Sequence, residues 1–282
     1  MLGLPGLEPI DYLVIGHITN DLTPAGPQLG GTAAYAGRTA HALGLRVGIV
    51  TAWGEENSTD LLQGITIVNH ACEKSTTFEN LYSDDGRIQY LRNIAPDIDY
   101  YHIPQLWRQT PLVHLGPVVH EVNANIARYF TTSQKLFTPQ GWLREWDENG
   151  RVYGAEWPEA QHMLNFVEAV VLSEEDLGYD RARIERLAHA AQLLVVTCGE
   201  HGADLYLEGQ LHHFPAPDVI DKDPTGAGDV FAAAFFIHYN NTQDPMDAVN
   251  YANQVAADSV TRHGLTGAPS MENLYEISIE VK

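Results

Sequence analysis

The 282-residue chain is long enough for one large α/β domain, and its 44% hydrophobic content is ordinary for a globular protein with a full core. Thirty-seven acidic and 16 basic residues give a formal net charge of −21 at pH 7, which argues against nucleic acid or an anionic membrane as a partner, because both need a basic surface. Two cysteines, no secretory signal pattern and no apolar run of about 18 residues predict a cytoplasmic protein in a reducing compartment.

Short aliphatic runs alternate with segments of helical spacing along most of the chain. This alternation predicts a mostly parallel central sheet with helices on both faces. The predicted strands are 12–15, 47–50, 112–115, 135–137, 170–172 and 193–196, and the predicted helices are 32–43, 121–133, 157–166, 180–190, 230–236 and 246–262.

One stretch interrupts this alternation. Residues 76–83 and 87–91 have the composition of strands and flank Asp84-Asp85-Gly86, and an Asp-Gly pair between such runs is typical of a β-hairpin. A hairpin alone is only marginally stable. We therefore expect a small β lid, formed by about 17–30 and 75–103 and inserted in a single domain that spans 1–282.

The segment after the first strand offers a carboxylate and a glycine pair for ligand binding. Open α/β sheets bind their ligands at the carboxyl ends of parallel strands. Asp21 can accept hydrogen bonds from sugar hydroxyls there, and Gly30 with Gly31 lets a polyol approach the backbone closely. On its own, an Asp at this position is more typical of an ordinary turn or cap.

Residues 223–229 read Asp-Pro-Thr-Gly-Ala-Gly-Asp and lead into the apolar run 230–236. Unshielded N–H groups at the start of a helix, together with the positive end of its dipole, form an anion site. Asp229 would repel a bound phosphate, unless it takes a proton from a hydroxyl while the N–H groups hold the transferred group. The alternative is a glycine-rich turn with an acidic helix start.

This run resembles the C-terminal signature of the ribokinase-like (PfkB) carbohydrate kinase family, usually Asp-Thr-x-Gly-Ala-Gly-Asp, with Pro224 where the family often has Thr. The resemblance covers nearly the whole chain. It implies an α/β fold: a three-layer α/β/α sandwich with a mostly parallel central sheet and a small β lid. It also implies transfer of phosphate from ATP, with Mg²⁺, to a hydroxyl of a small sugar, polyol or nucleoside. The same family often binds a monovalent cation (K⁺) beside the signature, to which Asp223 with Thr225 would contribute here. A homodimer through the lid is compatible with the resemblance.

By this resemblance Asp229 is the general base, and the N–H groups of Gly226, Ala227 and Gly228 stabilise the charge of the migrating phosphoryl group. Arg144 would add to this stabilisation. Arg144 also ends a Gln-x-x-x-Arg pattern that is similar to one in the myo-inositol-kinase-like branch of the family. Without the family resemblance, the alternative interpretation is that Trp142 and Trp146 are core residues and that Arg144 points outward to solvent.

The resemblance assigns the other site residues by their position. Residues 173–176, Ser-Glu-Glu-Asp, stand where the family often has Asn-x-x-Glu, although the same run is also an N-capped helix start. The assigned residues are, for the acceptor, Asp21, Gly30, Gly31, Tyr35 and Gln140; for the nucleotide, Thr197, Gly199, Gly202, Thr225, Asn253 and Gly264; and for metal ions, Asp176, Glu175 and Asp223.

The acceptor is expected to be a myo-inositol-like polyol or a nucleoside, rather than ribose or fructose 6-phosphate. Tyr35 replaces the small amide that the family commonly has near the sugar, and an aromatic ring favours stacking on a cyclic acceptor. The N-terminal half also offers few basic side chains for a phosphosugar.

A second hypothesis is a ligand-binding sensor that kept the fold and lost phosphotransfer. The short side chains of Ser173 and Asp176 favour it, and the intact Asp229 opposes it.

Overall fold

The computed structural model describes residues 6–24, 26–54, 56, 58–83 and 86–274. Asp84 and Asp85 of the predicted hairpin turn lie outside these residues. The strands are β1 (Tyr12–Ile15), β2 (Thr19–Thr23), β3 (Gly26–Gly30), β4 (Val47–Thr51), β5 (Thr66–Asn69), β6 (Thr77–Ser83), β7 (Gly86–Asn93), β8 (Leu112–Leu115), β9 (Gln134–Phe137), β10 (Arg144–Trp146), β11 (Val152–Gly154), β12 (Ala169–Ser173), β13 (Leu193–Thr197), β14 (Ala203–Leu207) and β15 (Gln210–Phe214).

Helices connect these strands. The α-helices are α1 (Thr32–Ala42), α2 (Ala160–Met163), α3 (Arg181–Ala190), α4 (Ala227–Thr242) and α5 (Pro245–Ser259). The 3₁₀ helices are η1 (Asp60–Leu62), η2 (Tyr100–His102), η3 (Gln105–Gln109), η4 (Ala124–Tyr129), η5 (Pro139–Leu143), η6 (Leu164–Phe166), η7 (Glu174–Leu177), η8 (Gly199–His201) and η9 (Gly264–Thr266).

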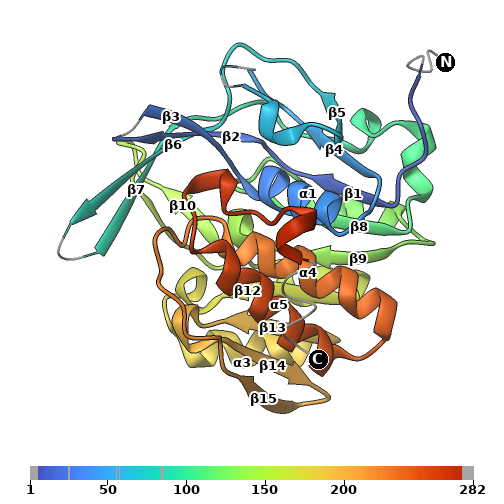
Figure 1. Ribbon diagram of the computed structural model, residues 1–282, viewed down its shortest axis with the longest axis vertical. Helices are drawn as coiled ribbons and strands as arrows, with labels where there is room; N and C mark the ends of the chain where they lie inside the picture. The colour runs from blue at the N-terminus through green and yellow to red at the C-terminus, as the bar shows by residue number, and fades with distance from the viewer. Residues whose placement is uncertain (1–5, 25, 55, 57, 84–85, 275–282) are drawn as a thin grey trace.

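A nine-stranded sheet of order β15-β14-β13-β12-β9-β8-β1-β4-β5 forms the centre of the molecule (Figure 1). The strands from β13 to β5 pair in parallel, and β14 and β15 extend one edge in antiparallel pairing. The six predicted strands all belong to its parallel part, which confirms the predicted α/β fold with a mostly parallel sheet.

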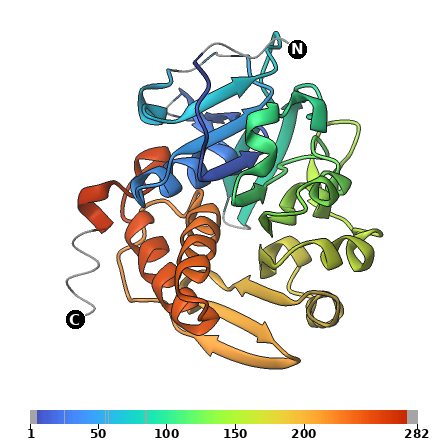
Figure 2. The ribbon, with the colours of Figure 1, turned by 90° about the vertical axis from the view of Figure 1, so that its right-hand side faces the viewer.

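Helical segments cover both faces of this sheet, and Figure 2 shows the orange and red helices α4 and α5 on one side and the green and yellow segments on the other. Side chains alternate between the faces along β1. Tyr12 and Val14 join the core under α1, α4 and α5, whereas Leu13 and Ile15 join the core on the opposite face. The two buried cores on either side of one sheet make the three-layer sandwich.

Strands β3, β2, β6 and β7 form a separate four-stranded sheet, drawn at the left of Figure 1. Strand β6 pairs antiparallel with β7 and parallel with β2. The segments expected to form a lid therefore do pair with each other, although their strands end at Asn93 and the chain to 103 adds η2 and an isolated bridge between Ile98 and Val122.

The helix predicted over 121–133 is wrong, because only the 3₁₀ helix η4 forms there. Glu121 is 1% exposed, and its carboxylate accepts the backbone N–H groups of His17, Val118 and Val119 at 2.9–3.2 Å. This buried carboxylate fixes a turn instead of a helix start. The helix predicted over 157–166 is likewise reduced to α2 and the 3₁₀ turn η6.

Candidate active site

A cavity of about 680 Å³ is lined by the carboxyl ends of the parallel strands and by the four-stranded sheet. It holds most of the residues predicted from the sequence, whereas Gly30, Asp223 and Gly264 are not part of its lining. The predicted residues that line it are Asp21, Gly31, Tyr35, Gln140, Arg144, Glu175, Asp176, Thr197, Gly199, Gly202, Thr225, Gly226, Ala227, Gly228, Asp229 and Asn253.

The signature loop ends at Gly226, which is the N-cap of α4 and has φ 79°. A Cβ at Gly226 would lie 2.3 Å from the ring of Tyr35, so the loop needs glycine for its backbone and for its packing. The ring of Tyr35 is 2% exposed and lies under the loop. This packing differs from the expected stacking of Tyr35 on the acceptor.

The backbone N–H groups of the loop divide into two kinds. The N–H of Ala227 donates to the carbonyl of Pro224 at 3.1 Å, so it is already used within the loop. Gly226 and Gly228 lie at the start of α4, where N–H groups have no partner within the helix. A Cβ at Gly228 would meet no atom within 4 Å, which leaves this side of the loop open to a ligand. Two of the three predicted N–H groups therefore remain for an anion.

Asp223 closes the loop from behind. Its carboxylate accepts the N–H of Thr225 at 3.0 Å and the N–H of Gly264 at 2.8 Å. Although partial burial acts in the opposite direction, these hydrogen bonds and the nearby His263 lower the pKa of Asp223. Asp223 and Gly264 thus hold the shape of the loop from outside the cavity.

Asp229 lies in the first turn of α4 and lines the cavity. Burial, reinforced by the charges of Asp176 and Asp21, raises its pKa to about 6, against the opposing effects of the Thr32 hydroxyl and Arg144. A carboxyl group with this pKa is mostly ionised at neutral pH and is a stronger base than an exposed aspartate. These properties suit a group that accepts a proton from a hydroxyl.

If Asp229 is the base, kcat/KM for the acceptor should rise tenfold per pH unit below about pH 6 and level off above it, because only the ionised carboxylate accepts a proton. Initial rates at saturating donor across about pH 5–8 measure this profile. A flat profile over that range would contradict the assignment.

Arg144, Gln140 and Asp176 form a cluster at the centre of the cavity wall. The Gln140 amide donates to Asp176 Oδ1 at 3.3 Å, and an Arg144 guanidinium nitrogen lies 3.9 Å from the same oxygen. Asp176 Oδ2 accepts the N–H of Ser173, whose side chain caps η7. Ser173 is therefore the N-cap of η7, as the sequence suggested. Asp176, its partner in the capping box, also lies beside Arg144 at the cavity.

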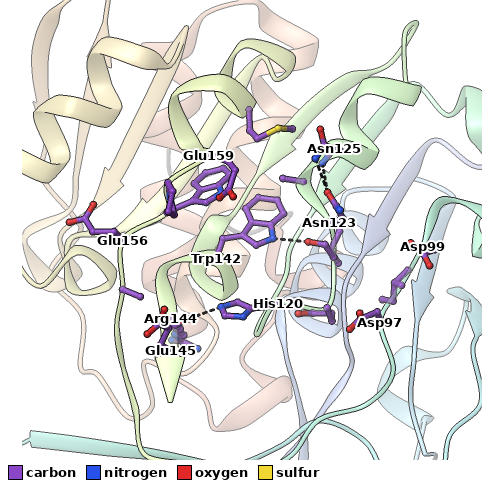
Figure 3. A pocket seen from close by; sticks show the side chains of 18 residues that line it. Asp97, Asp99, His120, Asn123, Asn125, Trp142, Arg144, Glu145, Glu156 and Glu159 are labelled. Carbon is purple, nitrogen blue, oxygen red and sulfur yellow. Dashed lines mark hydrogen bonds between the residues drawn. The ribbon is translucent and has the colours of Figure 1, made fainter. Parts of the chain in front are cut away.

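Arg144 also lines a second cavity, of about 460 Å³ (Figure 3). Trp142 and Trp157 stack at its floor, with ring centroids 4.8 Å apart, and Trp142 donates to the carbonyl of Val122 at 2.7 Å. The Arg144 side chain itself is 12% exposed. Trp142 is thus a core residue, but Arg144 does not point outward to solvent.

At one end of the cavity, Asp21 lies with residues of the four-stranded sheet. Asp21 accepts the hydroxyl of Thr19 at 2.8 Å, and a Cβ at Gly30 would lie 2.2 Å from Asp21 Oδ2. Gly30 therefore makes room for this carboxylate rather than for the ligand. On β6 and β7, Asn80 accepts from the Gln89 amide at 2.9 Å, and both side chains line the cavity.

The predicted nucleotide residues lie at the other end of the cavity. Gly202 has φ 100°, and a Cβ there would lie 2.0 Å from the Phe214 carbonyl, so this turn requires glycine. The Asn253 amide donates to the same carbonyl at 3.0 Å and holds the chain that follows β15. The wall beside Asn253 is apolar and consists of Val219, Ala256, Ala257 and Val260.

The cavity offers carboxylates that could bind a Mg²⁺ ion. In the described part of the chain, no three His, Cys, Asp or Glu side chains gather closely enough to hold a metal ion. Glu175 and Asp176 do line the cavity, and Mg²⁺ is commonly bound by one or two carboxylates together with substrate phosphates and water. These two residues therefore fit a magnesium ion carried in by the nucleotide. Asp223 is not part of this lining, and its two oxygens accept N–H groups of Thr225 and Gly264.

The comparisons with known proteins agree with this geometry. Residues 159–272 match the model of the pfkB family of carbohydrate kinases. The match covers the C-terminal part of the chain, which is similar to this family over that range. The chain is a carbohydrate or nucleoside kinase that transfers phosphate to a hydroxyl group, and its fold is that of the ribokinases.

Three similar proteins show the range of substrates and donors around this kinase. A cytidine kinase of Thermococcus kodakarensis is 24% identical, over 90% of this chain and 98% of its own length. An ATP-dependent ribose-1-phosphate kinase of Halopiger xanaduensis is 26% identical, over 86% of this chain and 84% of its own. A pyrophosphate-dependent kinase in the ribokinase family, solved with a pyrophosphate analog and myo-inositol, superposes with a TM-score of 0.79 at 18% identity, over 94% of this chain and 99% of its own.

Among the residues that line the cavity, sequence reasoning missed the polar side chains of Thr32, Asn80, Gln89 and Thr138. The signals in the sequence were weak. Thr32 follows the glycine pair directly, and Asn80 and Gln89 occupy paired positions of the predicted hairpin.

In the described residues, no helix is both long and apolar enough to cross a membrane.

Proposed function

We propose that this kinase transfers the terminal phosphoryl group of ATP to a hydroxyl of a neutral polyol, such as a myo-inositol-like ring, or of a nucleoside. The observation that carries the proposal is the position of Asp229, a carboxyl group with its pKa raised to about 6 at the N-terminus of α4. It lies in the same cavity as the acceptor residues of the lid and the open N–H groups of the loop. Asp229 accepts the proton, and the N–H groups of Gly226 and Gly228 stabilise the transferred group.

The charge of the cavity supports a neutral acceptor. Among the described lining residues, Arg144 is the one Lys or Arg, and it lies 3.9 Å from Asp176. A phosphosugar acceptor carries a second, permanent phosphate that needs its own basic partners. Asp21, Asn80 and Gln89 instead supply hydrogen bonds for hydroxyl groups. The expected stacking by Tyr35 no longer contributes to this preference, because its ring packs against Gly226.

The shape and charge of the donor side support ATP over pyrophosphate. The apolar wall of Val219, Ala256, Ala257 and Val260 gives a nucleotide base a surface that pyrophosphate cannot fill. Bare pyrophosphate would also need basic side chains that the described lining does not offer beyond Arg144. When bound, Mg²⁺ neutralises charge on the donor phosphates, and Glu175 and Asp176 are the residues that would hold it.

A panel of acceptors tests the function. Purified protein is incubated with Mg²⁺ and either ATP or pyrophosphate, and product formation is measured on inositols, nucleosides, ribose, fructose 6-phosphate and ribose 1-phosphate. We expect turnover with ATP on an inositol or a nucleoside. Efficient turnover of phosphosugars alone, or use of pyrophosphate alone, would contradict the assigned substrates, and binding without any turnover would favour the sensor hypothesis.

Replacing Asp21 by Ala should raise the acceptor KM and leave the KM for ATP nearly unchanged, since Asp21 lies on the lid side, away from the apolar wall. Loss of hydrogen bonds from a carboxylate to hydroxyls corresponds to about 1.5–3 kcal/mol, or roughly 10- to 100-fold in kcat/KM. Steady-state kinetics with each substrate varied in turn measure the two constants. An unchanged acceptor KM would remove Asp21 from the site.

The lid also presents a surface for dimerisation. Strand β3 pairs only with β2 among the described strands, so its outer edge carries unpaired backbone groups. We infer a homodimer through this edge. Sedimentation at several concentrations tests it, and a monomer at all of them would exclude it.

A further inference from the structure

Three buried side chains form a hydrogen-bonded chain behind the cavity. Tyr12 of β1 and His114 of β8 are both 0% exposed, and the Tyr12 hydroxyl lies 2.9 Å from His114 Nδ1. His114 Nε2 lies 2.9 Å from the hydroxyl oxygen of Thr138. Thr138 follows β9 directly, is 6% exposed and lines the cavity. The chain thus leads from the core under α4 to the cavity wall.

The direction of the first hydrogen bond follows from the protonation states. Burial lowers the pKa of His114 to about 3, so the imidazole is neutral and has one donor and one acceptor nitrogen. Burial, together with the charge of Asp229, raises the pKa of Tyr12, so its hydroxyl keeps its proton. Among the described residues, His114 is the one hydrogen-bond partner of this hydroxyl. The Tyr12 hydroxyl therefore donates to Nδ1, because the reverse arrangement would bury its proton without an acceptor.

The direction of the second hydrogen bond then follows. With Nδ1 accepting, the proton of His114 is on Nε2, which donates to the oxygen of Thr138. Thr138 is the N-cap of η5, but its side chain makes no capping hydrogen bond. The proton of the Thr138 hydroxyl is therefore available on the side of the cavity. The lack of a side chain at Gly116 lets Thr32 and Thr138 pack closely beside it. A Cβ at Gly116 would lie 2.3 Å from Thr32 and 3.1 Å from the Thr138 oxygen.

We propose that Tyr12 and His114 hold the Thr138 hydroxyl as a fixed hydrogen-bond donor to an oxygen of the phosphate acceptor, an inference that rests on the proposed kinase function. A hydroxyl that accepts from the imidazole offers its proton to the ligand, so the acceptor must present a lone pair there, as a hydroxyl or ring oxygen does. Thr138 is thereby a specificity-determining residue. Tyr12 and His114 are positioning residues that act through it.

Kinetics of single and double variants test this coupling. Thr138→Val should lower kcat/KM for the acceptor about tenfold through KM, which corresponds to one lost hydrogen bond, and Thr138→Ser should retain most of it. Tyr12→Phe should give a smaller loss, of about threefold, in the same constant, because the tautomer of His114 is no longer fixed. In the Thr138→Val background Tyr12→Phe should have no further effect. Thr110→Val is the matched control, since it removes a buried threonine hydroxyl bonded to Trp107 and should leave the acceptor KM unchanged.

The tautomer of His114 gives a readout that does not depend on activity. Long-range ¹H–¹⁵N correlation spectra of the full chain should show a neutral imidazole with its proton on Nε2, and Tyr12→Phe should disturb this state. A proton on Nδ1 would overturn the proposal even in an active kinase, and so would an equal effect of Tyr12→Phe on the acceptor KM with or without the Thr138 hydroxyl. If the acceptor panel shows no phosphorylation, the proposed function fails, while the Nε2 tautomer separately supports or excludes the chain of hydrogen bonds.

Discussion

Replacing Asp229 by Asn should lower kcat about 10²- to 10⁴-fold while the protein still folds and binds ATP. The amide keeps the size and polarity of the side chain in the first turn of α4, but it cannot accept a proton from the acceptor hydroxyl. Initial rates at saturating substrates give kcat, and calorimetric titration with ATP gives the affinity. A variant with the wild-type kcat would show that Asp229 is not the base.

The same substitution should change stability in a direction that depends on pH. The pKa of Asp229 is raised from 3.8 to about 6 in the folded protein, so folding is disfavoured when the group ionises. This cost is absent below about pH 4, grows between the two pKa values and reaches up to about 3 kcal/mol above about pH 6. Asp229→Asn should therefore raise Tm at pH 8 and leave it nearly unchanged at pH 4.

Asp60→Asn is a suitable control for both measurements, because Asp60 is an exposed carboxylate in η1, outside the cavity. It should alter neither kcat nor the pH dependence of Tm. If Asp229→Asn lowers Tm at pH 8, the carboxylate is stabilised by partners in the folded protein, and the physical basis for a strong base at this position is lost.

Replacing Gly228 by Ala should lower kcat on the order of 10²-fold without loss of stability. A Cβ at Gly228 would meet no protein atom within 4 Å, and Gly228 lines the cavity, so the added methyl group would occupy the space in front of the open N–H groups. Loss of one such donor to a developing charge typically reduces the rate about 10²- to 10³-fold. Alanine is also the better helix former, by up to about 1 kcal/mol, so Tm should stay the same or rise.

Gly226→Ala is the matched comparison in the same loop. Gly226 has φ 79°, and a Cβ there would lie 2.3 Å from the Tyr35 ring, so this variant should lose both activity and stability. Thermal unfolding and kcat of the two variants together separate blocking of the anion site from distortion of the loop. Full activity of the Gly228 variant would show that the phosphoryl group does not approach this backbone.

The parallel sheet could be predicted because its strands are short aliphatic runs that are buried on both faces. The runs 47–50 and 193–196 show this composition, and so do the other four predicted strands. The hairpin of the lid was equally accessible, since its Asp-Gly turn is a local signal. Interactions between distant segments could not be predicted from the sequence. The sequence suggested that Tyr35 stacks on the acceptor. In the fold, its ring packs against the loop at Gly226, which is far along the chain.

The parts of the site that escaped sequence reasoning depend on side chains that meet only in the fold. Tyr12 and His114 are 102 residues apart, and neither stands in a pattern that indicates a partner. Glu121 seemed to begin a helix, but its carboxylate is buried against the N–H groups of a turn that includes His17. The signature loop, in contrast, carries its geometry locally, in the positive φ of Gly226 and the helix start that follows.

A crystal structure with the preferred acceptor and a non-hydrolysable ATP analogue would show whether Asp229 and the signature loop meet the reacting groups. We expect the terminal phosphate at the N–H groups of Gly226 and Gly228, and an acceptor hydroxyl oxygen about 2.6–3.2 Å from the Asp229 carboxylate, in line with that phosphate. A terminal phosphate bound away from this loop, or an acceptor with no hydroxyl within reach of Asp229, would contradict this expectation.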